Sequence, residues 1–287
     1  MPSHNFSQNQ INFRPKLYLA LLVLVSFVAA YLPVWTSLLH TWASSDDYSH
    51  GFFIVPIVIY IIWQKKERLL AIPAETSIAG LLLLIISLVA YVLGSYAEIK
   101  TVASLSILTT LTGCILFLYG PHILKEVSFP LCFLIFMIPI PGQVYSAITI
   151  PLQLIVSKAS VDMLAAAGIP ILRDGNVIHL PAHTFEVVQA CSGLRSLITL
   201  LTLATVIAYF TLRFNTLRGI LIVSAIPAAI LVNIIRVTAM IVVYHLWGYN
   251  LTEGAVHTTI GVVIFILAIS IIYLFRNLLI PWDKPTC

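Results

Sequence analysis

Three side chains whose types are suited to acyl-transfer chemistry occur at apolar segments in the second half of the chain. Cys191 lies within residues 190–196 (Ala-Cys-Ser-Gly-Leu-Arg-Ser), directly before an apolar run. Arg236 follows Asn233 by three residues inside a long apolar run, and His257 begins the last such run. A thiolate can attack a carbonyl, an imidazole can transfer a proton near neutral pH, and a fixed cation can stabilise an oxyanion. Together they predict acyl-transfer chemistry, with Cys191, Arg236 and His257 as catalytic residues.

The surroundings of Cys191 favour the reactive form of the thiol. A helix that starts just after it and the nearby Arg195 both stabilise a thiolate relative to a thiol. Ser192 and Gly193 are supporting residues of the same motif. The alternative interpretation is a small residue that packs at the end of a membrane span. For Arg195 two roles are open, namely substrate binding and extension of its charge to the membrane surface.

Arg236 needs an explanation because charge inside a membrane is costly. On insertion scales an arginine near the bilayer centre costs about 2.5–3.5 kcal/mol. Asn233 lies one turn earlier on the same helix face and is a supporting residue. Extension of Arg236 to the interface is the alternative, and His257 taken alone can be an interfacial residue or a helix cap. Because the four cysteines and the pair His179 and His183 offer no complete ligand set, we predict no metal and no cofactor.

The composition restricts the class of protein. Of 287 residues, 60% are hydrophobic and only 9% are charged, whereas a soluble domain carries about 25% charged residues. Water cannot solvate such a surface, so soluble and disordered proteins are excluded and membrane lipid is the expected surrounding. A net charge of +4 in this context does not indicate a nucleic-acid partner.

Apolar runs predict an all-α polytopic bundle of about eight transmembrane helices, forming a single integral-membrane domain over residues 1–287. Before the sixth run, residues 142–193 form an interfacial or extracytoplasmic segment. It is predicted to hold an interfacial or re-entrant helix at 146–167, a turn at 173–176, and short strands at 177–180 and 184–188 that face outward. The eight runs lie at 17–39, 51–63, 78–95, 101–119, 127–141, 194–212, 217–246 and 257–275.

The basic residues predict the orientation in the membrane. With a cytoplasmic N-terminus and eight crossings, ten of the fifteen Lys and Arg residues face the cytoplasm, as the positive-inside tendency requires. Residues 1–16 and 276–287 are then cytoplasmic tails, and the three catalytic candidates share the outer face. The first apolar run lacks a small-residue cleavage site and is interpreted as a retained helix.

These motifs resemble those of the exosortase/archaeosortase family. The resemblance rests on residues 190–196, on Asn233-x-x-Arg236-Val237 and on His257, with further likeness at 174–181 and at 49–52 (Ser-His-Gly-Phe). It implies a membrane-embedded cysteine protease or transpeptidase in a bacterial inner membrane, with its active site toward the periplasm. The implied substrates are exported proteins that end in a Pro-Glu-Pro motif, a transmembrane helix and a basic tail, in bacteria that make exopolysaccharide.

The resemblance also implies a role for each group. Cys191 would form a thioester, His257 would protonate the leaving amine, and Arg236 would hold the oxyanion or orient the thiolate. The acceptor that resolves the thioester is unknown. Two other functions compete with this one: a transporter or flippase for a lipid-linked glycan, in which Arg236 binds phosphate, and a scaffold component of polysaccharide export.

Overall fold

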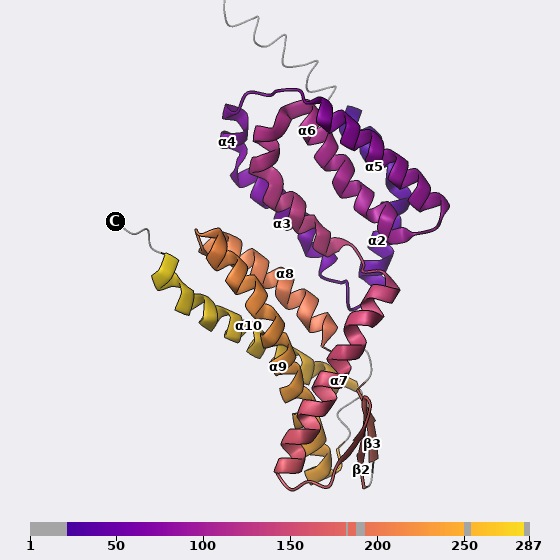
Figure 1. Ribbon diagram of the computed structural model, residues 1–287, viewed down its shortest axis with the longest axis vertical. Helices are drawn as coiled ribbons and strands as arrows, with labels where there is room; N and C mark the ends of the chain where they lie inside the picture. Colours follow the sequence, from indigo (N-terminus) through magenta and orange to yellow (C-terminus); the bar gives the residue numbers. More distant parts are fainter. Residues whose placement is uncertain (1–21, 182, 188–192, 250–253, 284–287) are drawn as a thin grey trace, which may run out of the picture. The chain divides into compact units, whose positions relative to one another are not determined.

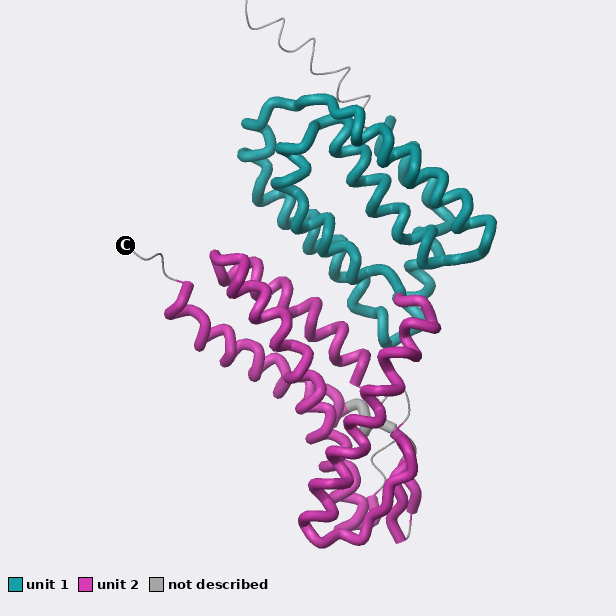
Figure 2. Tube along the Cα trace, viewed as in Figure 1, with its two compact units in different colours: residues 1–139 teal, residues 140–287 magenta. Residues whose placement is uncertain are grey.

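The chain forms two compact units, residues 1–139 and 140–287 (Figures 1 and 2). The computed structural model describes residues 22–181, 183–187, 193–249 and 254–283, with only the backbone described at 186 and 254–258. Cys191 and Ser192 lie outside the described residues, and so does the side chain of His257.

The predicted all-α polytopic membrane fold with one small sheet is confirmed. Six helices in the described ranges are long and apolar enough to cross a membrane, or seven if the pair Leu22–Ala30 and Leu32–Ser44, bent by 63°, forms one span. The described helices therefore fall short of the eight predicted spans. Helix α3 has only 14 residues, which is about 21 Å against a hydrocarbon core of about 30 Å. The predicted span 101–119 lies within the kinked helix α6, which also contains the first seven residues of the predicted span 127–141.

That kinked helix, α6, dominates unit 1. Gly120 interrupts it with φ +83°, a backbone angle that only glycine adopts readily. Pro121 follows directly, so the first arm of the helix ends here and a second arm begins. The first arm packs against α5, where a Cβ added to Gly113 would lie 2.9 Å from the backbone nitrogen of Leu84. Unit 1 comprises α2 (Leu32–Ser44), α3 (Gly51–Gln64), α4 (Lys66–Ala71), α5 (Ile78–Tyr96), α6 (Lys100–Phe133) and the 3₁₀ helix η1 (Leu134–Met137).

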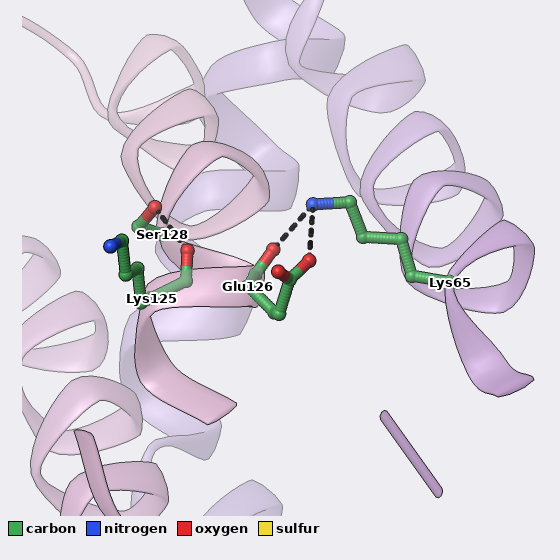
Figure 3. A network of polar contacts seen from close by, with 4 residues as sticks. All are labelled: Lys65, Lys125, Glu126 and Ser128. Carbon is green, nitrogen blue, oxygen red and sulfur yellow. Dashed lines mark hydrogen bonds and ion pairs between the residues drawn. The ribbon is translucent and has the colours of Figure 1, made fainter. Parts of the chain in front are cut away.

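A charged contact joins α3 to the second arm of α6. The Nζ of Lys65 donates to the backbone oxygen of Glu126 at 2.6 Å and lies 3.4 Å from its carboxylate (Figure 3). Lys125 and Ser128 lie on the adjoining turn, where the Ser128 hydroxyl donates to the Lys125 carbonyl at 2.8 Å. Lys65 and Lys125 therefore lie at the same end of unit 1.

Unit 2 contains the remaining helices and the sheet. The apolar runs predicted three of its helices closely, since 194–212, 217–246 and 257–275 correspond to α8, α9 and α10 (Figure 1). Unit 2 comprises α7 (Gly142–Ala166), β1 (Leu172–Asp174), β2 (Val177–Leu180), β3 (His183–Glu186), α8 (Leu194–Thr211), α9 (Asn215–Trp247), α10 (Gly254–Leu279) and the 3₁₀ helix η3 (Ile280–Asp283).

The sheet is antiparallel in the order β1-β2-β3. Strand β2 lies where it was predicted, but the turn predicted at 173–176 is shorter than expected. Arg173 pairs with Ile178 and Asp174 with Val177, so both residues belong to β1. Only Gly175 and Asn176 form the turn, with Gly175 at φ +62°. A two-residue loop with a glycine at positive φ is a common hairpin connection.

Helix α7 differs most from the sequence prediction. Residues 146–167 were expected to lie at the interface or re-enter the membrane, whereas α7 spans 25 residues and meets the length and composition of a membrane span. Its polar residues explain the difference, because the hydroxyl and amide side chains at 149, 153, 157 and 160 are buried within unit 2. A polar face that is buried in protein does not need the membrane surface.

Helices α8, α9 and α10 form a bundle with a tightly packed core. Small residues such as Ala204, Ala225, Ala229 and Ala268 lie in it beside larger ones such as Leu221. Small side chains allow helix backbones to approach closely, which is how helices associate inside lipid.

A carboxylate fastens one end of this bundle. Asp283, in η3 after α10, accepts hydrogen bonds from the backbone N–H groups of Arg213 (2.8 and 2.9 Å) and Phe214 (3.0 Å). These residues connect α8 to α9, so one side chain ties together the ends of all three helices. Hydrogen bonds to a charged acceptor are stronger than neutral ones.

We expect Asp283→Ala to destabilise the bundle by about 1.5–3 kcal/mol, the range for a hydrogen bond to a charged group. Thermal unfolding of the purified protein in detergent measures this as a lower midpoint. Asp283→Asn keeps one oxygen acceptor and should fall between Ala and wild type. Equal midpoints for all three proteins would show that the contact contributes nothing.

Candidate functional site

Helix α9 positions the polar pair that the sequence singled out. Asn233 is 3% exposed and Arg236 is 8% exposed, and both side chains lie in the interior of unit 2. A buried guanidinium is costly unless partners or an anionic ligand compensate its charge. The interpretation that Arg236 extends to the interface does not fit this burial. An interior cation is what an anion-stabilising site requires.

The cysteine motif meets this pair through Gly193. Gly193 caps the start of α8 with φ +84°, a backbone conformation that costs other residues about 1–2 kcal/mol. A Cβ added there would lie 2.9 Å from both Cγ and Nδ2 of Asn233. Backbone conformation and close packing therefore both require glycine, and the start of α8 rests directly on the Asn233 side chain.

Helix α10, which carries position 257 in its first turn, lies beside the pair at Gly261. A Cβ added to Gly261 would lie 4.0 Å from Nη2 of Arg236, so this glycine borders the guanidinium. Position 257 lies four residues earlier, in the first turn of α10. Residues four apart share a helix face, so position 257 belongs to the face of α10 that Gly261 turns toward Arg236.

The N-terminal parts of α8 and α10 thus lie beside the Asn233–Arg236 segment of α9. Both helices also pack against α9. The sequence predicted the three motifs but not Gly261 as their contact. The available signal was a small residue one turn after His257 in an apolar helix, which is a common sign of close helix packing. Arg195 is half-buried in the first turn of α8, and both of its predicted roles stay open.

Helix α7 contributes a polar face that the sequence pattern did not indicate as functional. Thr149, Gln153, Ser157 and Ser160 are all buried, and their spacing of three and four residues aligns them on one face. The Ser160 hydroxyl donates to the carbonyl of Ile234 at 3.5 Å, and the Ser157 hydroxyl to that of Gly175 at 3.1 Å. The polar face of α7 therefore holds α7 against α9 next to Asn233, and it also holds α7 against the hairpin turn.

The motif at 49–52 has a packing role within unit 1. The Nε2 of His50 donates to the carbonyl of Phe136 at 3.1 Å. Trp42 packs where a Cβ of Gly51 would lie and donates to the carbonyl of Met137 at 2.9 Å. Burial lowers the pKa of His50 below its ordinary value of 6.5, which keeps the ring neutral at pH 7.

Gly261 allows a graded test of the contact with Arg236. Its added Cβ would meet Arg236 at an ordinary contact distance, so Gly261→Ala should retain most activity. Gly261→Leu fills the space beside the guanidinium and should lower turnover about 100-fold, because a displacement of about 1 Å at a reactive site has that effect. The measurement is the rate at which each variant processes a substrate with the predicted sorting signal, normalised to the amount of protein in the membrane. Equal turnover for Ala and Leu would contradict the placement.

Comparison with known proteins adds one match. A family model described as transmembrane exosortase matches residues 42–274, a range that includes all three motifs. No curated protein and no solved structure matches the chain.

Proposed function

This chain belongs to the transmembrane exosortase family, and we propose that it is a membrane-embedded cysteine protease and transpeptidase with Cys191, Arg236 and His257 as its catalytic residues. Its substrates are exported proteins with a C-terminal Pro-Glu-Pro motif, transmembrane helix and basic tail. It acts at the periplasmic face of a bacterial inner membrane with both termini in the cytoplasm, and serves envelope sorting linked to exopolysaccharide production.

One observation supports the proposal most strongly. Gly193, two residues after Cys191, contacts Asn233, while Gly261, four residues after position 257, borders Arg236. Cys191 lies more than forty residues before Asn233 in the sequence, and position 257 lies about twenty residues after Arg236. Described neighbours of both nevertheless lie against one segment of α9. A site with a nucleophile, a proton donor and a cation needs this kind of convergence.

The reaction begins with a thiolate. In this proposal the helix start that follows Cys191 and the guanidinium of Arg236 lower the free-energy cost of a negative charge on its sulfur, and His257 holds the proton. The sulfur attacks the carbonyl carbon of the scissile peptide, and the electron pair of the C=O bond moves to oxygen. Arg236 stabilises that oxyanion, which develops only in the transition state and intermediate.

Collapse of the intermediate breaks the C–N bond. His257 gives its proton to the departing amine, and the N-terminal part of the substrate stays on Cys191 as a thioester. The neutral imidazole then takes a proton from water or from an acceptor amine, which attacks the thioester and releases the thiolate. Asn233 and Gly193 position the start of α8, and with it the nucleophile.

A reporter assay tests this function. An exported reporter that ends in Pro-Glu-Pro, an apolar helix of about 20 residues and a basic tail is co-expressed with the full chain in a bacterium. We expect a shortened reporter that has lost the helix and tail, and no shortening when the helix follows directly without the motif. An unprocessed reporter beside a membrane-inserted, accumulating chain would contradict the proposal.

A further inference from the structure

A small cavity lies in unit 2 between the sheet and the end of α9. Its volume is about 340 Å³, and it is lined by Leu180, Pro181, Tyr244, His245 and Gly248. This volume lies at the lower end of the range of small-ligand sites, about 300–1,000 Å³. The polar side chains among these residues, a phenol and an imidazole, can both donate hydrogen bonds, and the described lining residues include no carboxylate. The lining therefore suits a ligand that combines apolar surface with a hydrogen-bond acceptor.

Aromatic packing holds one wall of this cavity in place. The ring of Tyr244 lies 4.7 Å from that of His183 and 5.2 Å from that of Phe185, centroid to centroid, and both of these residues belong to β3. Phe185 is buried and belongs to a hydrophobic cluster that includes Ile178 and Ile241. Such edge-to-face and tilted contacts fix ring orientation. Tyr244 is thus a rigid aromatic surface before any ligand arrives.

The cavity also lies at a defined depth relative to the membrane. Helix α9 ends at Gly248, with φ +70°, and Trp247 and Tyr249 beside it are 63% and 68% exposed. Exposed Trp and Tyr at the end of a membrane helix are typical of the membrane–water interface. The residues that precede a transmembrane helix in a substrate pass through this same level.

We propose that this cavity binds the Pro-Glu-Pro segment of the sorting signal, an inference that rests on the proposed function. A proline ring packs against the part of Tyr244 that lines the cavity, as proline-rich segments do in aromatic-lined grooves. The glutamate carboxylate accepts hydrogen bonds from His245 and from the Tyr244 hydroxyl. Tyr244 and His245 are substrate-binding residues and take no part in bond cleavage.

The geometry of α9 relates this subsite to the reactive groups. Tyr244 follows Arg236 by eight residues, which corresponds to about 12 Å along the helix. An extended chain covers that distance in about four residues. The bond that is cleaved therefore lies about four residues beyond the bound motif, on the side of the substrate's transmembrane helix.

The test measures each enzyme variant with each of two reporter substrates. His245 is exposed, so His245→Gln should not disturb folding, and Tyr244→Phe keeps the ring. With purified full-length protein and the Pro-Glu-Pro reporter, we expect His245→Gln to raise KM about tenfold with kcat within twofold. With a Pro-Gln-Pro reporter, the KM of the wild type should rise by a similar factor, and His245→Gln should raise this KM no further. Tyr244→Ala should raise KM for both reporters, and Tyr244→Phe should raise it only for the glutamate reporter.

The matched control is His122→Gln, an exposed histidine of α6 in unit 1, which should process both reporters as wild type does. Unchanged KM for His245→Gln and Tyr244→Ala would overturn the subsite while the protease stands. Equal KM increases for His245→Gln with both reporters would also overturn it, because the histidine would then not recognise the glutamate. No processing by wild type, or full processing by Cys191→Ala, would instead refute the proposed function.

Discussion

Replacement of Cys191 by alanine is expected to reduce reporter processing at least about 1,000-fold, to background, because removal of a catalytic nucleophile leaves only binding and oxyanion stabilisation. Cys191→Ser should fail as well, since the serine hydroxyl ionises far less readily than a thiol. Quantitative immunoblotting of processed and intact reporter, normalised to chain in the membrane, measures both variants.

Two other cysteines provide matched controls. Cys114 and Cys132 are free cysteines of unit 1, and Cys114→Ala and Cys132→Ala should process the reporter as wild type does. Normal processing in both Cys191 variants would contradict the proposed function and favour the transporter or scaffold interpretation. Loss of processing in a control variant that still accumulates would place the nucleophile elsewhere.

Arg236→Gln is expected to lower kcat about 100- to 1,000-fold, the effect of removing one oxyanion donor from a preorganised site. KM should change little, because the charge that Arg236 stabilises develops only during the reaction. Arg236→Lys keeps the charge but loses the planar fork of donors, so it should recover only part of the rate. Steady-state kinetics of the purified variants with the reporter peptide distinguish these cases.

Arg276 is a suitable control for this prediction. It lies in the last turn of α10, where its guanidinium hydrogen-bonds the Asn277 side chain at 2.9 Å and lies 5.6 Å from the Tyr273 ring. Arg276→Gln should therefore retain its kcat. A glycan transporter predicts a different pattern, in which the function of the chain depends on Arg236 and is indifferent to Cys191.

The sequence predicted the elements of the fold where apolar runs are long and uninterrupted. The run at 78–95 corresponds to α5, and the runs at 194–212 and 217–246 to α8 and α9, because length and apolar character alone define a membrane helix. Helix α7 was harder to predict, since its Ser, Thr and Gln side chains suggest a surface when no burial is known. Strand β1 was missed because Arg-Asp-Gly-Asn has the composition of a turn.

The candidate site was predicted as a set of residue types but not as an arrangement. The order of helices in a bilayer cannot be derived from apolar periodicity, so the contact of Gly193 with Asn233 was not predictable. The same holds for Gly261 beside Arg236, where one glycine in an apolar helix has many possible neighbours. The subsite at Tyr244 and His245 depends on a sheet and a helix end that are about sixty residues apart.

The central claim is that Cys191 forms a thioester with the substrate, and trapping that acyl-enzyme tests it most directly. The purified chain is mixed with a sorting-signal peptide, quenched in acid, digested and mapped by mass spectrometry, with hydroxylamine treatment as the check for a thioester. We expect the N-terminal part of the peptide on the fragment that contains Cys191, lost on hydroxylamine treatment and absent from Cys191→Ala. Peptide cleavage that leaves Cys191 unmodified at every quench time, with an adduct on another residue, would contradict the account.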